Sequence, residues 1–299
     1  MKHNLPLGVS AILVASLLYS AMNAIFKIHA PTLPPLPVVI FFQAFFALLL
    51  LLPFVFKDGL AKAKATMTTH RIGLHIFRAC CSLLITYLLF YSVMYIPLVN
   101  ALLLSNSAPL IVPFVGYLFF SEKINHKLWM PVLLGYAGVA IVLNPDSNFF
   151  NPAALLAFGS AIALAFTVQV VRKLTATDSI TTITFYFLIF STLLSGIISI
   201  PFWQPVSTAQ LIIMAEIGAL YFSSQYLANA SMKYANPQLI SSLMYSNVIY
   251  AAIISLLVWN ILPSLHTVIG IILVVVGSIA CIRIEHMSVK RAAQQVLFE

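Results

Sequence analysis

The sequence predicts an all-α integral membrane protein: ten transmembrane helices in two inverted five-helix repeats, with both termini cytoplasmic. Composition, charge distribution and a weak internal repeat lead to this prediction. Of the 299 residues, 62% are hydrophobic and only 7% are charged, and the mean hydropathy is +1.03. A soluble domain carries about 25% charged residues. The composition therefore excludes a soluble globular domain, a disordered chain and a nucleic-acid-binding protein.

Apolar runs long enough to cross a bilayer recur along the whole chain. A spanning helix needs about 20 mostly apolar residues. Ten segments meet this requirement: residues 7–28, 37–56, 72–93, 97–120, 128–145, 152–172, 180–201, 208–230, 237–259 and 265–284. Strands of a membrane barrel instead alternate over about 10 residues, so helices are favoured. The connections are too short for a separate soluble domain.

The positive charges predict the orientation of the chain. With the N-terminus inside, 14 of the 15 Lys and Arg residues fall in cytoplasmic loops or tails, or at their edges, and Lys27 alone falls outside. Membrane proteins place Lys and Arg on the cytoplasmic side in this way. Both termini are therefore expected in the cytoplasm.

A weak internal repeat relates the two halves. An offset of 139 residues aligns Gly138 with Gly277, and an offset of 146 aligns Asn23 with Gln169. Each repeat has five helices, so the second must enter the membrane in the opposite orientation, as in many alternating-access carriers. The expected units are residues 1–146 (first repeat), 147–286 (second repeat) and 287–299 (cytoplasmic tail).

Several motifs resemble those of a known family. Lys27 ends the first predicted helix, His75-Ile-Phe-Arg78 opens the third, and residues 95–123 carry a Pro-Leu-Val-Asn-Ala stretch. With these motifs the chain resembles ten-helix EamA-type members of the drug/metabolite transporter superfamily, and within it the subgroup of S-adenosylmethionine uptake carriers. The resemblance implies a scaffold or dimer role for the fifth and tenth helices. Gln43 departs from the family, which usually has Arg there, so an anion-binding role at that position is in doubt.

Glu216 is the strongest single candidate for a binding residue. It lies nine residues after Ser207, whose capping box opens the eighth helix, and so about 13 Å along that helix. Charges at such depth are costly and are functional hypotheses by default. Glu216 is either a pocket carboxylate for a substrate ammonium or a proton, or an interfacial acid. Lys27 either pairs with it or extends to the outer surface, whereas Arg78 is interpreted as an inner-face anchor.

Polar clusters lie at matched depths in the fourth and ninth helices, and a matched polar pair lies in the first and sixth. Pro109 and Pro113 follow the fourth-helix cluster, and each frees a backbone carbonyl. Broken helices are typical of carrier binding sites, although the same polar residues also join helices. The predicted substrate-binding residues are Glu216, Asn106, Ser107, Asn247, Ser246, Tyr245, Asn23, Gln169, Lys27 and Gln43.

These features predict a secondary transporter that moves a small polar metabolite, amino-acid-like or S-adenosylmethionine-like, across the bacterial inner membrane by alternating access. The alternatives are a drug or amino-acid exporter of the same superfamily and, in a different class, a membrane-embedded enzyme or receptor. An enzyme needs a catalytic constellation, and Glu216 alone lies deep in the bilayer. The partners expected are a small-molecule substrate and the lipid bilayer, with a homodimer allowed. No cofactor, metal or nucleic acid is expected.

The role of Glu216 has a direct test. If its carboxylate binds the solute or a coupling proton, Glu216→Gln will weaken transport and change its pH profile, because burial and pairing control whether a carboxylate is charged. Transport in vesicles measured across pH checks this. An unchanged affinity, rate and pH profile would identify Glu216 as a tolerated interfacial acid.

Overall fold

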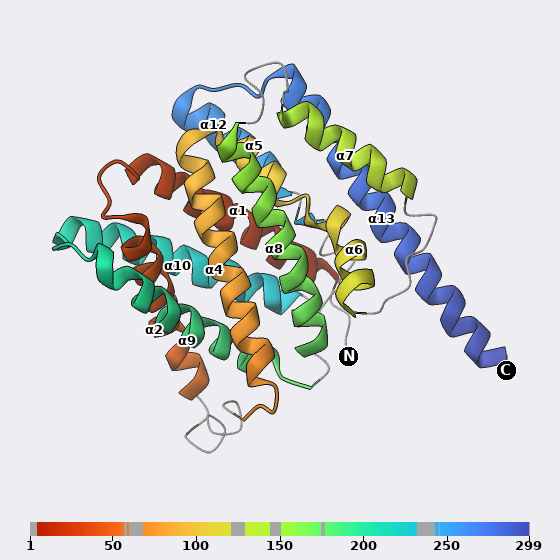
Figure 1. Cartoon of the computed structure of the whole chain (residues 1–299), viewed down its shortest axis with the longest axis horizontal. Helices are drawn as coiled ribbons and strands as arrows, with labels where there is room; N and C mark the ends of the chain where they lie inside the picture. Colours follow the sequence, from red (N-terminus) through yellow and green to blue (C-terminus); the bar gives the residue numbers. More distant parts are fainter. Residues whose placement is uncertain are drawn as a thin grey trace.

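The computed structural model describes residues 5–56, 59, 68–120, 129–143, 151–174, 177–231, 243–244 and 246–298. Within these residues the protein is helical throughout and contains no β-strand (Figure 1). Six of its helices are long and apolar enough to cross a membrane. The predicted all-α class is thereby confirmed, while the ten-helix count and the orientation of the termini stay predictions.

The helices follow one another with short connections. The first half contains α1 (Leu5–His29), α2 (Leu36–Phe56), α4 (Ile72–Tyr95), α5 (Leu98–Ser105), α6 (Ala108–Phe120) and α7 (Trp129–Leu143). The second half contains α8 (Pro152–Leu174), α9 (Ile180–Ser199), the 3-10 turn η2 (Ile200–Phe202), α10 (Thr208–Ser231), α12 (Ser246–Trp259) and α13 (Leu265–Phe298). Helix α13 continues through most of the segment expected to be a cytoplasmic tail.

The segment predicted as one helix over residues 97–120 is interrupted between α5 and α6. Asn106 Nδ2 donates a hydrogen bond to the Leu102 carbonyl at 2.7 Å, and Ser107 Oγ donates to the Leu104 carbonyl at 2.6 Å. The same two carbonyls also accept the backbone N–H groups of Asn106, at 2.9 Å, and Ser107, at 3.2 Å, so backbone and side chain together close the end of α5. Pro109, which has no N–H, lies in the first turn of α6, where that loss costs little.

Local signals also explain where other helices begin. Ser207 Oγ accepts from the Gln210 N–H at 3.3 Å, and the Ser207 N–H donates to Gln210 Oε1 at 2.9 Å. This is the reciprocal capping box predicted at the start of the eighth helix, and it is confirmed. Ser179 caps α9 by accepting from the Thr182 N–H at 3.1 Å.

The helix contacts recur in pairs between the two halves. Under the predicted offsets, α1 corresponds to α8, α2 to α9, α4 to α10 and α7 to α13. Helix α1 packs on α10 and α4 packs on α8; likewise α2 packs on α10 and α4 on α9. The remaining large contacts, α2 with α9 and α7 with α13, join corresponding helices directly. Reciprocal contacts of this kind are what a two-fold axis produces.

The contact between α7 and α13, at one edge of the molecule in Figure 1, depends on glycine. A Cβ atom at Gly138 would lie 2.8 Å from the Gly270 carbonyl oxygen, and one at Gly277 would lie 2.6 Å from the Pro131 carbonyl oxygen. The contact is reciprocal, because Gly270 and Gly277 lie 139 positions after Pro131 and Gly138. Small residues here let the two backbones touch.

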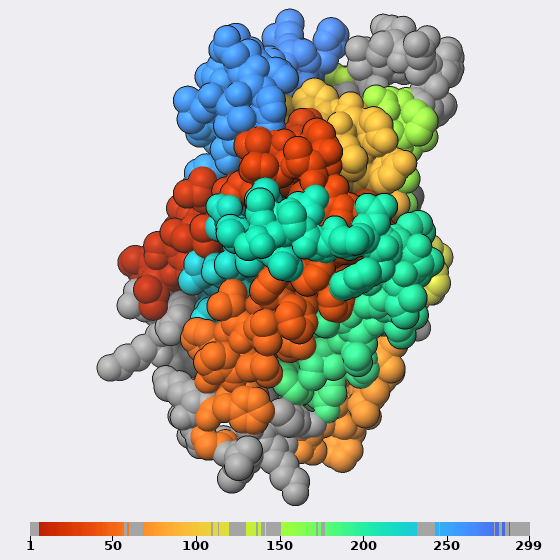
Figure 2. Space-filling view, turned by 90° about the vertical axis from the view of Figure 1, so that its left-hand side faces the viewer, coloured from red at the N-terminus to blue at the C-terminus, as the bar shows by residue number. Residues whose placement is uncertain are grey.

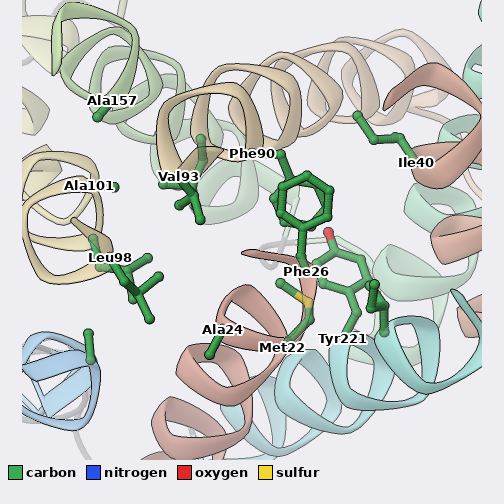
Figure 3. Close-up of a cluster of buried hydrophobic side chains, with 14 of the residues drawn as sticks. Met22, Ala24, Phe26, Ile40, Phe90, Val93, Leu98, Ala101, Ala157 and Tyr221 are labelled. Atoms are coloured by element: carbon green, nitrogen blue, oxygen red, sulfur yellow. The ribbon is translucent and has the colours of Figure 1, made fainter. Parts of the chain in front are cut away.

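Large apolar side chains fill the centre of the bundle. The rings of Phe26 from α1 and Phe90 from α4 stack with centroids 4.0 Å apart. Figure 3 shows this pair beside Met22 and Tyr221, with Ile40 on the neighbouring α2. The first half and the second half therefore share one hydrophobic core.

The outer surface is apolar as well. Exposed side chains on α2, α9, η2 and α10 include Phe54, Ile197, Ile200 and Ile212, and Figure 2 shows the face on which these helices lie. Large exposed apolar areas are rare on soluble monomers. Contact with lipid explains the surface in a membrane protein, where the surroundings are as apolar as the helices.

A larger side chain at Gly277 is expected to weaken the fold. Gly277→Ala places a methyl group against backbone atoms that cannot rotate away, and overpacking of this kind costs about 1–3 kcal/mol. Gly73→Ala is the matched control, because a Cβ there meets nothing within 4 Å. Thermal unfolding of the purified protein in detergent measures both. A stability loss at Gly73 equal to that at Gly277 would contradict the explanation.

Candidate functional site

A small cavity lies where α2, α4, α9 and α10 meet. Its volume is about 10 Å³, which is room for about one water molecule and far below the roughly 300–1,000 Å³ typical of small-molecule sites. The cavity is lined by Ile40, Gln43, Ala44, Ser82, Leu83, Thr86, Phe187, Ser191 and Tyr221. A metabolite could enter this cavity only if the four helices moved apart.

Both halves of the chain contribute to this cavity. Helices α2 and α4 belong to the first half, and α9 and α10, their counterparts, belong to the second. Tyr221 lies 139 positions after Ser82, so these two lining residues occupy corresponding places in the two repeats. The cavity is therefore at the centre of the reciprocal packing.

Two polar side chains in the cavity wall have unused hydrogen-bonding capacity. Gln43 is 2% exposed and Ser191 is 3% exposed. Within the described part of the chain, Gln43 Oε1 and Ser191 Oγ have no hydrogen-bond partner. Gln43 Nε2 donates only to the sulfur of Met22, at 3.7 Å. A buried polar atom left without a partner costs about 1–3 kcal/mol, so a polar solute that reaches these atoms gains binding energy.

Asn23, Gln169 and Asn247, predicted as binding residues, are buried away from the cavity. Ser20 Oγ, on α1 beside Asn23, donates to the Asn247 carbonyl at 2.9 Å and joins α1 to α12. Gln169 Nε2 donates to the Val112 carbonyl at 3.4 Å and joins α8 to α6. None of the three lines the cavity. The Gln169 side chain joins two helices, whereas the Asn23 side chain donates to the Tyr19 carbonyl of its own helix at 2.8 Å, and the Oδ1 atoms of Asn23 and Asn247 have no partner among the described residues.

The residues around the two predicted breaks have separate fates. Asn106 and Ser107 are the interruption between α5 and α6, and their side chains donate to the carbonyls of α5. Ser246 opens α12, and its Oγ has no hydrogen-bond partner within the described residues. Tyr245 lies outside the described residues. Ser246 and Asn106 do not line the cavity either.

Neither Glu216 nor Lys27 lines the cavity, and their side chains form no ion pair with each other. Glu216 is on an exposed face of α10, where no acid–base pair with Lys27 is formed among the described residues. Lys27 Nζ donates to the Ile96 carbonyl and sits over the Trp259 ring, 5.7 Å from its centroid. Of the predicted binding residues, Gln43 is the one that lines the cavity.

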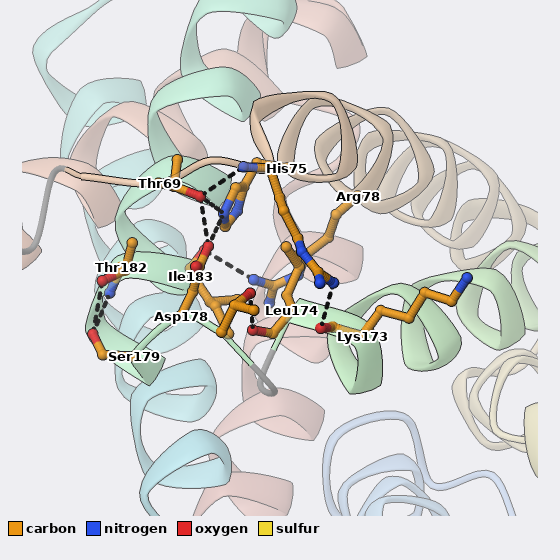
Figure 4. Close-up of polar contacts among 11 residues, drawn as sticks. Thr69, His75, Arg78, Lys173, Leu174, Asp178, Ser179, Thr182 and Ile183 are labelled. Carbon is orange, nitrogen blue, oxygen red and sulfur yellow. Dashed lines mark hydrogen bonds and ion pairs between the residues drawn. The ribbon is translucent and has the colours of Figure 1, made fainter.

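A second polar cluster ties the start of α4 to the connection between α8 and α9 (Figure 4). Asp178 Oδ2 lies 2.7 Å from His75 Nε2 and accepts a hydrogen bond from Thr69 Oγ1 at 2.7 Å. Burial raises the pKa of Asp178, but the hydrogen bonds from Thr69 and His75 outweigh it and leave the pKa below its ordinary value. His75 belongs to a motif noted in the sequence, but its partner 103 positions away could not be read from spacing.

Arg78 is a further candidate for a functional residue. The sequence predicts an inner-face anchor, which would be exposed, but the structure buries its side chain, which is 5% exposed. Its guanidinium lies 4.7 Å from the centre of the Phe187 ring, which lines the cavity. The spacing of Arg78, Ser82 and Thr86 along α4, four residues apart, was the signal that could have placed it on the cavity face.

An all-helical fold with an apolar exterior, and a small cavity lined from both halves of the chain, define a multi-pass membrane protein. The model of the EamA-like transporter family matches residues 6–144 and 151–283. The chain therefore belongs to the EamA-like transporter family.

Named relatives are bacterial transporters. The pseudopaline exporter CntI of Pseudomonas aeruginosa is 26% identical over 92% of this chain and 96% of its own length. The S-adenosylmethionine uptake transporter of Rickettsia bellii is 24% identical over 85% of this chain and 86% of its own. The riboflavin transporter of Vibrio cholerae is 26% identical over 73% of each chain. These relatives are consistent with a multi-pass protein of the inner membrane.

A protein of known crystal structure shares the fold. It superposes with a TM-score of 0.57 at 18% sequence identity and covers 92% of this chain and 95% of its own. The helical arrangement is therefore not peculiar to this chain.

The hydrogen bonds to Asp178 predict an acid sensitivity. Since its folded pKa is lowered, Asp178 stabilises the fold above its ordinary pKa of about 3.9 and loses that contribution as the pH falls through the folded value. Thr69→Val removes one hydrogen bond and brings the folded pKa nearer its ordinary value, so the stability lost on acidification should be smaller and the loss complete at a higher pH. Melting temperatures between about pH 3 and pH 6 measure this. Thr167→Val, which loses a hydroxyl bonded to its own helix, should leave the acid limb unchanged.

Proposed function

We propose that the protein is a secondary transporter that moves a small polar metabolite across the bacterial inner membrane by alternating access. The cavity between α2, α4, α9 and α10 is its substrate site. The observation that carries this proposal is the pair of buried polar atoms, Gln43 Oε1 and Ser191 Oγ, that face the cavity from the two halves and have no partner in the described protein. Membership of a transporter family supports it, and we propose no enzymatic activity.

The proposed architecture has ten spans in two inverted repeats, residues 1–146 and 147–286. The reciprocal contacts of α1 with α10 and α4 with α8, and the reciprocal glycine contacts of α7 with α13, support a two-fold relation. An odd number of helices per repeat makes such a relation an inversion across the membrane. A cavity on the axis between two inverted halves opens to one side when the halves tilt one way and to the other side when they tilt back.

The substrate is proposed to be amino-acid-like or S-adenosylmethionine-like. The relatives' names include an uptake transporter, an exporter and a riboflavin transporter whose name gives no direction, so direction is a separate question for vesicle experiments. The cavity wall supplies the amide of Gln43 and the rings of Tyr221 and Phe187. It also supplies three aliphatic hydroxyl groups, on Ser82, Thr86 and Ser191. A polar solute with an apolar or ring portion matches that set.

Removing the unpartnered polar atoms should impair transport without harming the fold. Gln43→Leu and Ser191→Ala each delete a buried polar atom that forms no hydrogen bond in the described protein, so stability should stay level or rise. Binding of the solute loses a neutral hydrogen bond, and KM should rise about three- to tenfold. Uptake of labelled amino acids, nucleosides and S-adenosylmethionine into proteoliposomes measures KM.

Ser195→Ala is the matched control on the same helix. Ser195 is buried and donates to the carbonyls of its own helix, and it does not line the cavity. Its substitution should leave KM unchanged. Equal KM values for all three variants and the parent protein would show that the cavity is not the substrate site.

The proposed topology is tested at the C-terminus. After replacement of the three native cysteines, a cysteine introduced within residues 287–299 should react with a membrane-impermeant maleimide only once the cells are opened. This follows because a cytoplasmic tail is shielded by the membrane. Ready labelling of the tail in intact cells would overturn the proposed orientation.

A further inference from the structure

Arg78 is a buried cation with incomplete hydrogen bonding. Its side chain is 5% exposed, and its Nη1 donates to the Ile183 carbonyl at 2.9 Å. Its Nε has no partner within the described residues. The guanidinium also lies against the face of Phe187, 4.7 Å from the ring centre. A guanidinium has five N–H groups, and here the one on Nε is buried without an acceptor among the described residues.

No described carboxylate pairs with this cation. Asp178 lies five residues before Ile183, the residue whose carbonyl accepts from Arg78. Its carboxylate is bound instead to His75 and Thr69. Glu216, the other acid whose side chain is described, is on an exposed face of α10. A buried charge without a partner is strongly unfavourable. An anion supplied from outside the described chain would resolve this.

The place of Arg78 in the fold shows where such an anion would bind. Arg78, Ser82 and Thr86 are spaced by four residues along α4, so they lie on one helix face. Ser82 and Thr86 line the cavity, and Phe187 lines it and contacts Arg78. Tyr221, which lines the cavity from α10, lies within electrostatic range of the guanidinium. Arg78 therefore borders the cavity at the end nearer the start of α4.

We propose that Arg78 binds the carboxylate of the transported solute, so that the substrates are carboxylate-bearing metabolites such as zwitterionic amino acids and their derivatives. This inference rests on the proposed function and names its substrate class. One guanidinium fits one carboxylate through paired hydrogen bonds. The other polar residues of the cavity are uncharged, which suits a single negative charge better than a phosphate dianion.

The test compares solutes that differ only in the carboxylate. The probes are S-adenosylmethionine with its decarboxylated form and L-methionine with L-methioninamide, applied as substrates and competitors in proteoliposomes. The parent protein should favour the carboxylate member of a pair about ten- to a hundredfold, the range of a hydrogen bond to a charged group. Arg78→Gln should abolish that preference, and affinity for the carboxylate-free member should change little.

Two further variants separate binding from folding. Arg71→Gln removes a nearby positive charge that donates to the Lys173 carbonyl and should keep the parent preference. Ser82→Asp places a carboxylate one helical turn from Arg78 on the same face, where it should pair with the guanidinium, raise the melting temperature and suppress binding of carboxylate solutes. Ser82→Asp keeps the inference testable even if Arg78→Gln fails to fold.

The outcomes distinguish the two proposals. Transport that shows no preference for carboxylates, or a preference that persists in Arg78→Gln or Ser82→Asp, would overturn the inference and leave the transport function standing. No flux of any solute, riboflavin included, through the parent protein would contradict the proposed function and the inference with it. Loss of preference in Arg78→Gln alongside an unchanged Arg71→Gln would support both.

Discussion

Every polar group that enters hydrocarbon must find its hydrogen-bond partner within the protein, and the rest of this structure follows from that constraint. It makes the described chain helical, because a helix satisfies its own backbone. It also explains why hydroxyl side chains bond to their own helices, as Thr86 does to the Ser82 carbonyl at 3.0 Å. Between α5 and α6, the side chains of Asn106 and Ser107 also bond back to carbonyls of α5 and so use their own donors within the protein.

The same constraint makes exceptions informative. Gln43, Ser191 and Arg78 keep buried polar atoms without partners in the described protein, and all three lie at or beside one cavity. Ten buried side-chain atoms lack a partner among the described residues, and these three are the ones at or beside the cavity. Each such atom calls for an explanation. A solute that completes their hydrogen bonds is one explanation that accounts for all three together.

Hydropathy and proline positions predicted the fold well because they report depth and continuity along a helix. The capping box at Ser207 and the interruption near Pro109 could be predicted for the same reason, since both depend on residues close in sequence. The site depended instead on which side of each helix faces inward. On α10, Gly218 contacts α2, with a built Cβ only 2.7 Å from the Phe46 Cβ. Glu216, two residues earlier, points to another side, so its depth was a poor guide to its surroundings.

Residues 139 positions apart are alike where α7 meets α13 and differ in the cavity wall. Gly138 and Gly277 are identical and hold α7 against α13, while Ser82 and Tyr221 occupy equivalent places in the cavity wall and share no chemistry. Both helices of the α7–α13 contact need glycine, because each lies against the backbone of the other. The described cavity wall has no such close backbone contact to keep, so its residues can differ between the two halves. The cavity walls that the two halves contribute therefore differ in chemistry, whereas the contact between α7 and α13 is formed by glycine from both sides.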